Sequence, residues 1–253
     1  MPKRIGWAWL RCFVVLVLVL ASLPGATASR AADSGPRLYV YLPSTVRPPM
    51  LQKVLNDALP GTTVMVFRHL RDFETSALES PPDFVISARP FLDQHDEWTP
   101  ILQGFAGDRT DETYVLVSLG QAADSPLEAS AVVGVVDLLG KKAMPALVAR
   151  FVGASAPPKV TRVAQPEDLL PLLELGLAKA VLMPARAVAA LREKSTLNLR
   201  VVELKDARMG LPSLAVVSKR SPAGEMERKL VSGLSGLPAK VQAMLGVDAW
   251  RRP

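Results

Sequence analysis

The feature that most constrains the fold is the alternation of short β-rich runs with segments of helical periodicity. Three β-rich runs, at 37–43, 62–67 and 83–87, are separated by two segments whose apolar residues recur at helical spacing. Strands and helices that alternate in this way form βαβ units, because the helix carries the chain back across a parallel sheet. A second such series is expected, with strands at 131–137, 160–163, 179–183 and 199–204. The chain is therefore predicted to be an α/β protein built from two similar units.

The first 28 residues have the three parts of an export signal. A basic start at 3–11 precedes the apolar run 12–21, and small residues at 26–28 match a cleavage pattern. The run is shorter than the roughly 20 residues that a membrane-spanning helix needs. We expect 1–28 to be removed, which predicts a bacterial periplasmic protein without a membrane span. An uncleaved anchor is the alternative, since two tryptophans extend the apolar stretch.

Composition limits the function classes that are open to the chain. Its 253 residues carry a net charge of +6, with one Cys and two His. Without 1–28, 27 basic residues face 24 acidic ones, a net charge of +3, and no cysteine remains. A disulfide framework and a multi-Cys metal site are excluded, and so weak a charge does not favour a nucleic-acid partner. No nucleophile elbow, zinc or nucleotide motif occurs, so we predict no catalytic residue, metal or cofactor.

Five stretches of sequence carry a resemblance to a known group of proteins. They are RLYVYLPSTVRPPMLQKVLNDAL, PPDFVISARPF, DETYVLVSLGQAADSPLEASAVVGVVDLLG, PEDLLPLLELGLAKAVLMPARAVAAL and GLPSLAVVSKRSP. Their order resembles the type 2 periplasmic binding proteins, and within them the phosphate, phosphite and phosphonate binding components of ABC transporters. The resemblance implies two α/β lobes, each a mostly parallel sheet flanked by helices, joined by crossover strands near 113–119 and 211–218.

The resemblance also implies a division of the chain and a mode of binding. Lobe 1 is expected at 29–118 and lobe 2 at 119–212, with 213–253 forming a return strand and C-terminal helices that pack on lobe 1. A ligand would bind in the cleft between the lobes, which would close around it.

Two of the four loops expected to contact a ligand lie in lobe 1. Ligands of open α/β sheets bind at the carboxyl ends of strands, near helix N-termini. Ser44 and Thr45 follow the first strand, where they would either hold an anion or cap the next helix. Ser87 ends the third strand and Arg89 follows it, and Arg89 offers a fork to phosphate or carboxylate. A surface arginine without a ligand is the alternative there.

The other two loops lie in lobe 2. Asp137 ends a buried strand, where it would either bind a cationic group or cap the turn. In phosphonate binders the next turn is rich in Ser, Thr and Gly, whereas this chain has Leu138-Leu139-Gly140 followed by Lys141 and Lys142. The two lysines would either supply positive charge to an anion or be solvated. Arg186 would either face the cleft or lie on the exposed start of its helix.

These observations predict an exported, non-enzymatic substrate-binding protein. It would capture a small anionic ligand between its lobes for an ABC permease. A degenerate binding module that acts as a periplasmic sensor or recognises a partner, without transport, is the alternative. An enzyme that shares the fold is a third reading, against which the export signal and the missing catalytic motifs argue.

Overall fold

The computed structural model describes residues 35–120, 131–217 and 224–253. The expected signal segment 1–28 lies outside the described residues. Gly35–Pro253 forms one compact unit. Among the described residues, none of the helices has the length and apolar character needed to cross a bilayer.

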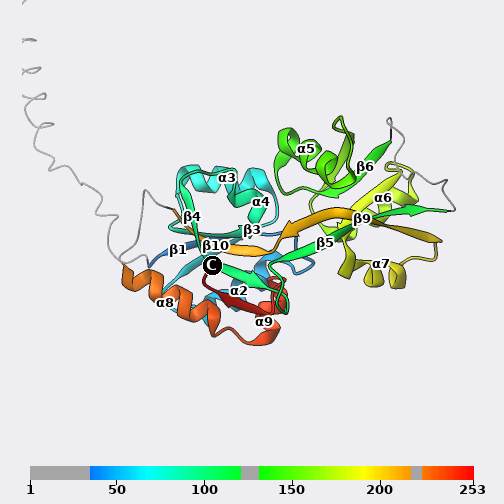
Figure 1. Cartoon of the computed structure of the whole chain (residues 1–253). Helices are drawn as coiled ribbons and strands as arrows, with labels where there is room; N and C mark the ends of the chain where they lie inside the picture. Colours follow the sequence, from blue (N-terminus) through cyan, green and yellow to red (C-terminus); the bar gives the residue numbers. More distant parts are fainter. Residues whose placement is uncertain (1–34, 121–130, 218–223) are drawn as a thin grey trace, which may run out of the picture. The chain divides into compact units, whose positions relative to one another are not determined.

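Six strands form the first sheet, in the order β11-β4-β10-β3-β1-β2 (Figure 1). Their bounds are β1 Arg37–Tyr41, β2 Thr63–Phe67, β3 Phe84–Ala88, β4 Trp98–Phe105, β10 Pro212–Val217 and β11 Ala249–Arg251. We call this sheet and its helices lobe 1. The helices are α2 Pro48–Ala58, α3 Leu70–Glu79, α4 Arg89–Leu92, α8 Gly224–Ser235 and α9 Ala239–Met244.

Five strands form the second sheet, in the order β7-β6-β8-β5-β9. Their bounds are β5 Asp111–Leu119, β6 Val132–Val136, β7 Lys159–Val163, β8 Ala180–Pro184 and β9 Leu199–Gly210. With its helices this sheet is lobe 2. The helices are α5 Gly140–Val152, η1 Pro166–Asp168, α6 Leu169–Glu174, η2 Ala185–Ala187 and α7 Val188–Lys194.

Both sheets are mixed rather than mostly parallel, which corrects the sequence expectation. In lobe 1, β1 is parallel to β2 and β3, whereas β10 is antiparallel to β3 and β4. In lobe 2, β6 is parallel to β7 and β8, but β5 is antiparallel to β8 and β9. The antiparallel partners β5 and β10 are the first strands that the chain forms after it crosses between lobes: β5 on entering lobe 2 and β10 on returning to lobe 1. No βαβ crossover leads into them, so nothing requires them to be parallel to their neighbours.

The chain crosses between the two sheets through two short connections, of which the second lies within the expected stretch 211–218 and the first does not lie within 113–119. All of β5 pairs within the second sheet. The chain therefore passes from lobe 1 to lobe 2 in residues 106–110 and not within 113–119. The chain returns from lobe 2 to lobe 1 at Leu211, between β9 and β10. By sheet pairing, 111–118 belongs with lobe 2, whereas the expected boundary put these residues in lobe 1. The boundary between the lobes depends on which strands pair with each other over long sequence separations. Local periodicity therefore does not predict it.

Alternation of side chains along β1 builds two cores in lobe 1. Leu38 and Val40 pack with α2, α8 and α9 on one face of the sheet. Tyr39 and Tyr41 pack with Phe73 of α3 on the other face, because successive side chains of a strand point to opposite faces. Figure 1 shows α3 and α4 over one face, and α2, α8 and α9 over the other. In lobe 2, α5 covers one face of the sheet and α6 and α7 the other.

Candidate functional site

Residues of both lobes line a cavity of 340 Å³, which we call the cleft cavity. Lobe 1 contributes the loop after β1, and also Ala88, Pro212 and 243–246. Lobe 2 contributes residues from β5, β6, β8 and β9, from the middle of α5 and from the start of α7. The volume is within the range typical of small-molecule sites. Of the eight predicted site residues, Ser44, Thr45 and Arg186 line this cavity.

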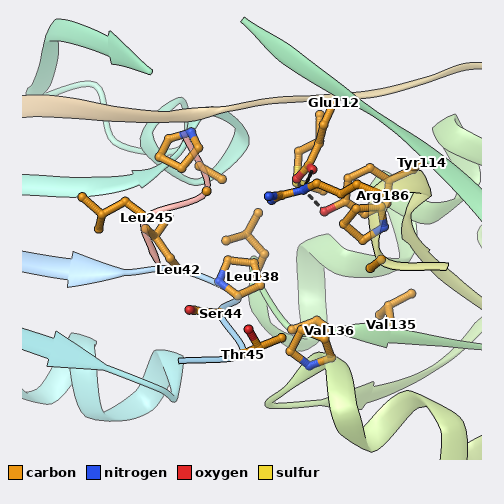
Figure 2. Close-up of a pocket in the computed structure, with 18 of the residues that line it drawn as sticks. Leu42, Ser44, Thr45, Glu112, Tyr114, Val135, Val136, Leu138, Arg186 and Leu245 are labelled. Atoms are coloured by element: carbon orange, nitrogen blue, oxygen red, sulfur yellow. Dashed lines mark hydrogen bonds and ion pairs between the residues drawn. The ribbon is translucent and has the colours of Figure 1, made fainter. Parts of the chain in front are cut away.

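The loop after β1 brings two hydroxyl groups to the lobe 1 wall (Figure 2). Ser44 Oγ accepts a hydrogen bond from the backbone N–H of Val46, at 3.0 Å. Neither Ser44 nor Thr45 caps α2, because that helix begins at Pro48 with Arg47 at its N-cap. Proline suits this start because it lacks the N–H that a first-turn residue would leave unsatisfied. The capping alternative is therefore wrong, and both hydroxyl groups remain at the cavity.

An arginine–glutamate pair supplies the charge on the lobe 2 wall. Nε of Arg186 lies 2.6 Å from Oε2 of Glu112, and the guanidinium group extends beyond Glu112 into the cavity (Figure 2). Glu112 is 18% exposed and Arg186 59%. The guanidinium group also comes near lobe 1, since a Cβ added at Gly246 would lie 3.1 Å from its Nη2. The pair is close to neutral as a whole, yet it leaves other guanidinium N–H groups free to donate.

The remaining surface of the cleft cavity is largely apolar. Val135, Leu138 and Leu182 are buried side chains that line it. Tyr114 also lines it, and its hydroxyl group donates to Sδ of Met209 at 3.4 Å. Burial raises the pKa of the Tyr114 phenol far above its ordinary value, so the phenol stays neutral.

Three predicted residues lie around a different cavity of 690 Å³, which we call the basic cavity. Asp137, Lys141 and Lys142 line it from lobe 2. Oδ1 of Asp137 accepts from the backbone N–H of Gly140 at 2.8 Å, and Oδ2 pairs with Arg162. Asp137 therefore caps the turn before α5, which is the alternative expected for it. Its backbone carbonyl also accepts a hydrogen bond from the Tyr41 hydroxyl of lobe 1, at 2.8 Å.

Ser87 and Arg89 line neither of these cavities. Ser87 is fully buried and donates to the backbone carbonyl of Tyr41 at 2.6 Å. Arg89 is the first residue of α4, and its Nε lies 2.6 Å from Oδ1 of Asp93 one turn later. Both side chains have partners within lobe 1, and a role for either in ligand binding stays a prediction.

Sequence reasoning missed several residues of the cleft cavity. Glu112 stands beside Arg186 because Tyr114 of β5 pairs with Pro184 of β8. The segment 243–246, at the end of α9, reaches the cavity from the far end of the chain. Neither has a local motif, so only the long-range pairing of strands and the packing of α9 could reveal them. Among the described residues, no group of His, Cys, Asp and Glu is arranged to hold a metal ion.

Comparison with known proteins identifies the architecture. No protein-family model matches the sequence, and neither does any curated protein. Among solved structures, the binding protein component of an ABC phosphonate transporter from Pseudomonas aeruginosa matches with a TM-score of 0.62 at 13% identity, over 87% of this chain and 82% of that chain. A Xanthomonas citri protein bound to chloride ion matches with a TM-score of 0.60 at 14% identity, over 86% of this chain and 91% of that one.

A third solved structure has a similar fold. The VFT2 domain of Bordetella pertussis BvgS matches with a TM-score of 0.54 at 12% identity, over 85% of this chain and 94% of that one. The chain thus has the two-lobe fold of type 2 periplasmic binding proteins, which confirms the fold that the resemblance implied. At these identities the likeness concerns the fold alone, so the ligand must be argued from the cavities.

Proposed function

We propose that this chain is a periplasmic solute-binding protein whose cleft cavity holds a small molecule with an apolar body and one anionic group. The observation that carries the proposal is the cleft cavity itself, in which both lobes contribute to apolar walls that carry one guanidinium group. The anionic group would accept from Arg186 and from the hydroxyl groups of Ser44 and Thr45. Glu112 would hold Arg186 in position.

Delivery to an ABC permease is the fate of the ligand that we propose first. The phosphonate-transporter component from Pseudomonas aeruginosa has the same fold, and a binding protein of this kind would start at Ser29 after loss of 1–28. The wall chemistry changes the expected ligand, however. Leu138 is buried at the turn where phosphonate binders have hydroxyl groups, so a molecule with apolar surface fits better than phosphate alone.

Sensing without transport is the second candidate. It is supported by the BvgS domain of the same fold and by the replacement of the hydroxyl-rich turn with Leu138-Leu139-Gly140. A permease gene next to the gene for this chain would favour import, whereas an adjacent histidine kinase gene would favour sensing. Both candidates require a ligand in the cleft cavity.

A thermal-shift screen tests the cleft site. The probes are phosphate, phosphite, methylphosphonate and carboxylates of increasing alkyl length. A ligand at 100 times its Kd stabilises a protein by about 2.7 kcal/mol, so its binding raises Tm measurably. We expect a carboxylate or phosphonate with an alkyl chain to raise Tm and Arg186→Gln to abolish the shift.

Arg208→Gln is the matched control for this screen. Arg208 also pairs with a carboxylate, that of Asp111 at 3.4 Å, but it does not line the cleft cavity. The control variant should keep the full shift in Tm. A screen in which no anion raises Tm, or in which Arg186→Gln responds as the wild type does, would contradict the proposal.

A further inference from the structure

Cationic side chains from both lobes gather around the basic cavity, apart from the cleft cavity. Arg68, between β2 and α3, and Arg71, in the first turn of α3, line it from lobe 1. Lys141 and Lys142, in the first turn of α5, line it from lobe 2 together with Arg162. No residue that lines this cavity also lines the cleft cavity.

The charges around the basic cavity are unbalanced. Five Arg and Lys side chains face only two carboxylates, those of Glu74 and Asp137. The Asp137 carboxylate is already engaged by the Gly140 N–H and by Arg162. Within the described parts of the chain, Arg68, Arg71, Lys141 and Lys142 have no hydrogen-bond or ion-pair partner from their side chains. The cavity therefore presents four unpaired cations against the one remaining carboxylate, that of Glu74, which leaves an excess of three positive charges.

Two cations of each lobe face the same cavity, so their mutual repulsion opposes the approach of the lobes at this point. An anion that accepts from both pairs would replace this repulsion with attraction. Hydrogen bonds from Arg or Lys to phosphate or carboxylate oxygens are among the strongest in proteins, and Arg donates in a bidentate manner. At 690 Å³ the cavity has room for a small molecule.

We propose that the basic cavity is a second binding site, for a small anion with two or more negative charges, and that this anion links the two lobes. Its phosphate or carboxylate groups contact Arg68 and Arg71 on one side and Lys141 and Lys142 on the other. The site differs in chemistry from the apolar cleft cavity, so the two sites take different ligands. An anion that links the lobes favours their closed arrangement and thereby modulates binding in the cleft.

Calorimetric titration of the full chain with inorganic pyrophosphate tests the site. Ionic strength is held constant with a monovalent salt, so that general screening does not change during the titration. We expect binding of one pyrophosphate, weakened at least tenfold in the double variant Lys141→Gln/Lys142→Gln. The double variant Arg192→Gln/Lys194→Gln removes the same charge from the exposed end of α7 and should bind as the wild type does. Absence of binding to the wild type, or equal weakening in both variants, overturns the proposal.

Two further variants locate the anion between the lobes. Arg68→Gln, in lobe 1, should weaken pyrophosphate binding as strongly as a single change at Lys141. If only the lobe 2 lysines matter, the link between the lobes is refuted. Arg186→Gln should leave pyrophosphate binding unchanged, because Arg186 belongs to the cleft cavity. A loss of binding in Arg186→Gln would place the anion in the cleft and overturn the second site. Circular dichroism verifies that every variant is folded.

Discussion

The Arg186–Glu112 pair decides the electrostatics of the cleft cavity. Sequence reasoning identified Arg186 from its position after the strand at 179–183, but not Glu112, which is over 70 residues away in the chain. Because Arg186 is more than half exposed, solvent screening leaves the pair little weight in stability, as for most exposed pairs. The ion pair instead orients the Arg186 side chain, since Glu112 holds its guanidinium group over the cavity.

Tyr114 leads to a prediction of pH dependence. Burial raises the pKa of its phenol, whereas in the unfolded chain the phenol ionises near its ordinary value of about 10. The protonated Tyr114 phenol therefore contributes its full share of the free energy of unfolding below about pH 10. This share is lost as the pH rises above that value, because the phenol then ionises in the unfolded chain. Tyr114→Phe should lose less stability than the wild type between about pH 9 and 11, as measured by urea unfolding. Parallel losses in the two proteins would show that Tyr114 does not carry this dependence.

Among the elements, the short connections between the lobes depend on close packing. Gly210 ends β9 immediately before the exchange at Leu211, and it pairs with Asp111 at the start of β5. A Cβ at Gly210 would lie only 2.7 Å from Cβ of Arg89. Arg89, predicted as a ligand residue, therefore packs with its stem against the connection between the sheets. This contact joins α4 of lobe 1 to β9 of lobe 2.

Substitution of Gly210 tests this contact. Gly210→Ala should destabilise the protein by about 1–3 kcal/mol, because the added methyl group meets the rigid base of a side chain and forces the backbone apart. The measurement is the free energy of unfolding in urea. Gly224→Ala is the matched control, since a Cβ at this helix start meets nothing within 4 Å and alanine favours a helix. Equal stability of Gly210→Ala and the wild type would refute the packing argument.

For the molecule as a whole, one apolar core extends through both lobes. Tyr41 and Phe73 of lobe 1 belong to the same buried cluster as Val135 and Leu138 of lobe 2. The hydrogen bond from Tyr41 to the carbonyl of Asp137 joins the lobes beside this cluster. If one lobe unfolded, the other would lose buried contacts. The lobes should therefore not unfold independently.

This continuity predicts a single cooperative unfolding transition. Trp98 and Trp250, the tryptophans of the described residues, both lie in strands of lobe 1. With Trp7 and Trp9 replaced by Phe, fluorescence reports on lobe 1, whereas far-ultraviolet circular dichroism reports on both lobes. The two urea transitions should coincide. A second transition seen by circular dichroism alone would mean that lobe 2 unfolds separately.

The sequence by itself determined the elements and the class of fold. Periodicity predicted the strands of both series, because side chains alternate along a strand and recur along a helix within a few residues. It left Trp98–Phe105 and Ala249–Arg251 unassigned as strands, since, among the described strands, β4 pairs only with the distant β10 and β11, and β11 only with β4. Only the tertiary structure divided the predicted residues, with Ser44, Thr45 and Arg186 at one cavity, Asp137, Lys141 and Lys142 at another, and Ser87 and Arg89 at neither. That division depends on contacts between residues far apart in the chain, which no local pattern encodes.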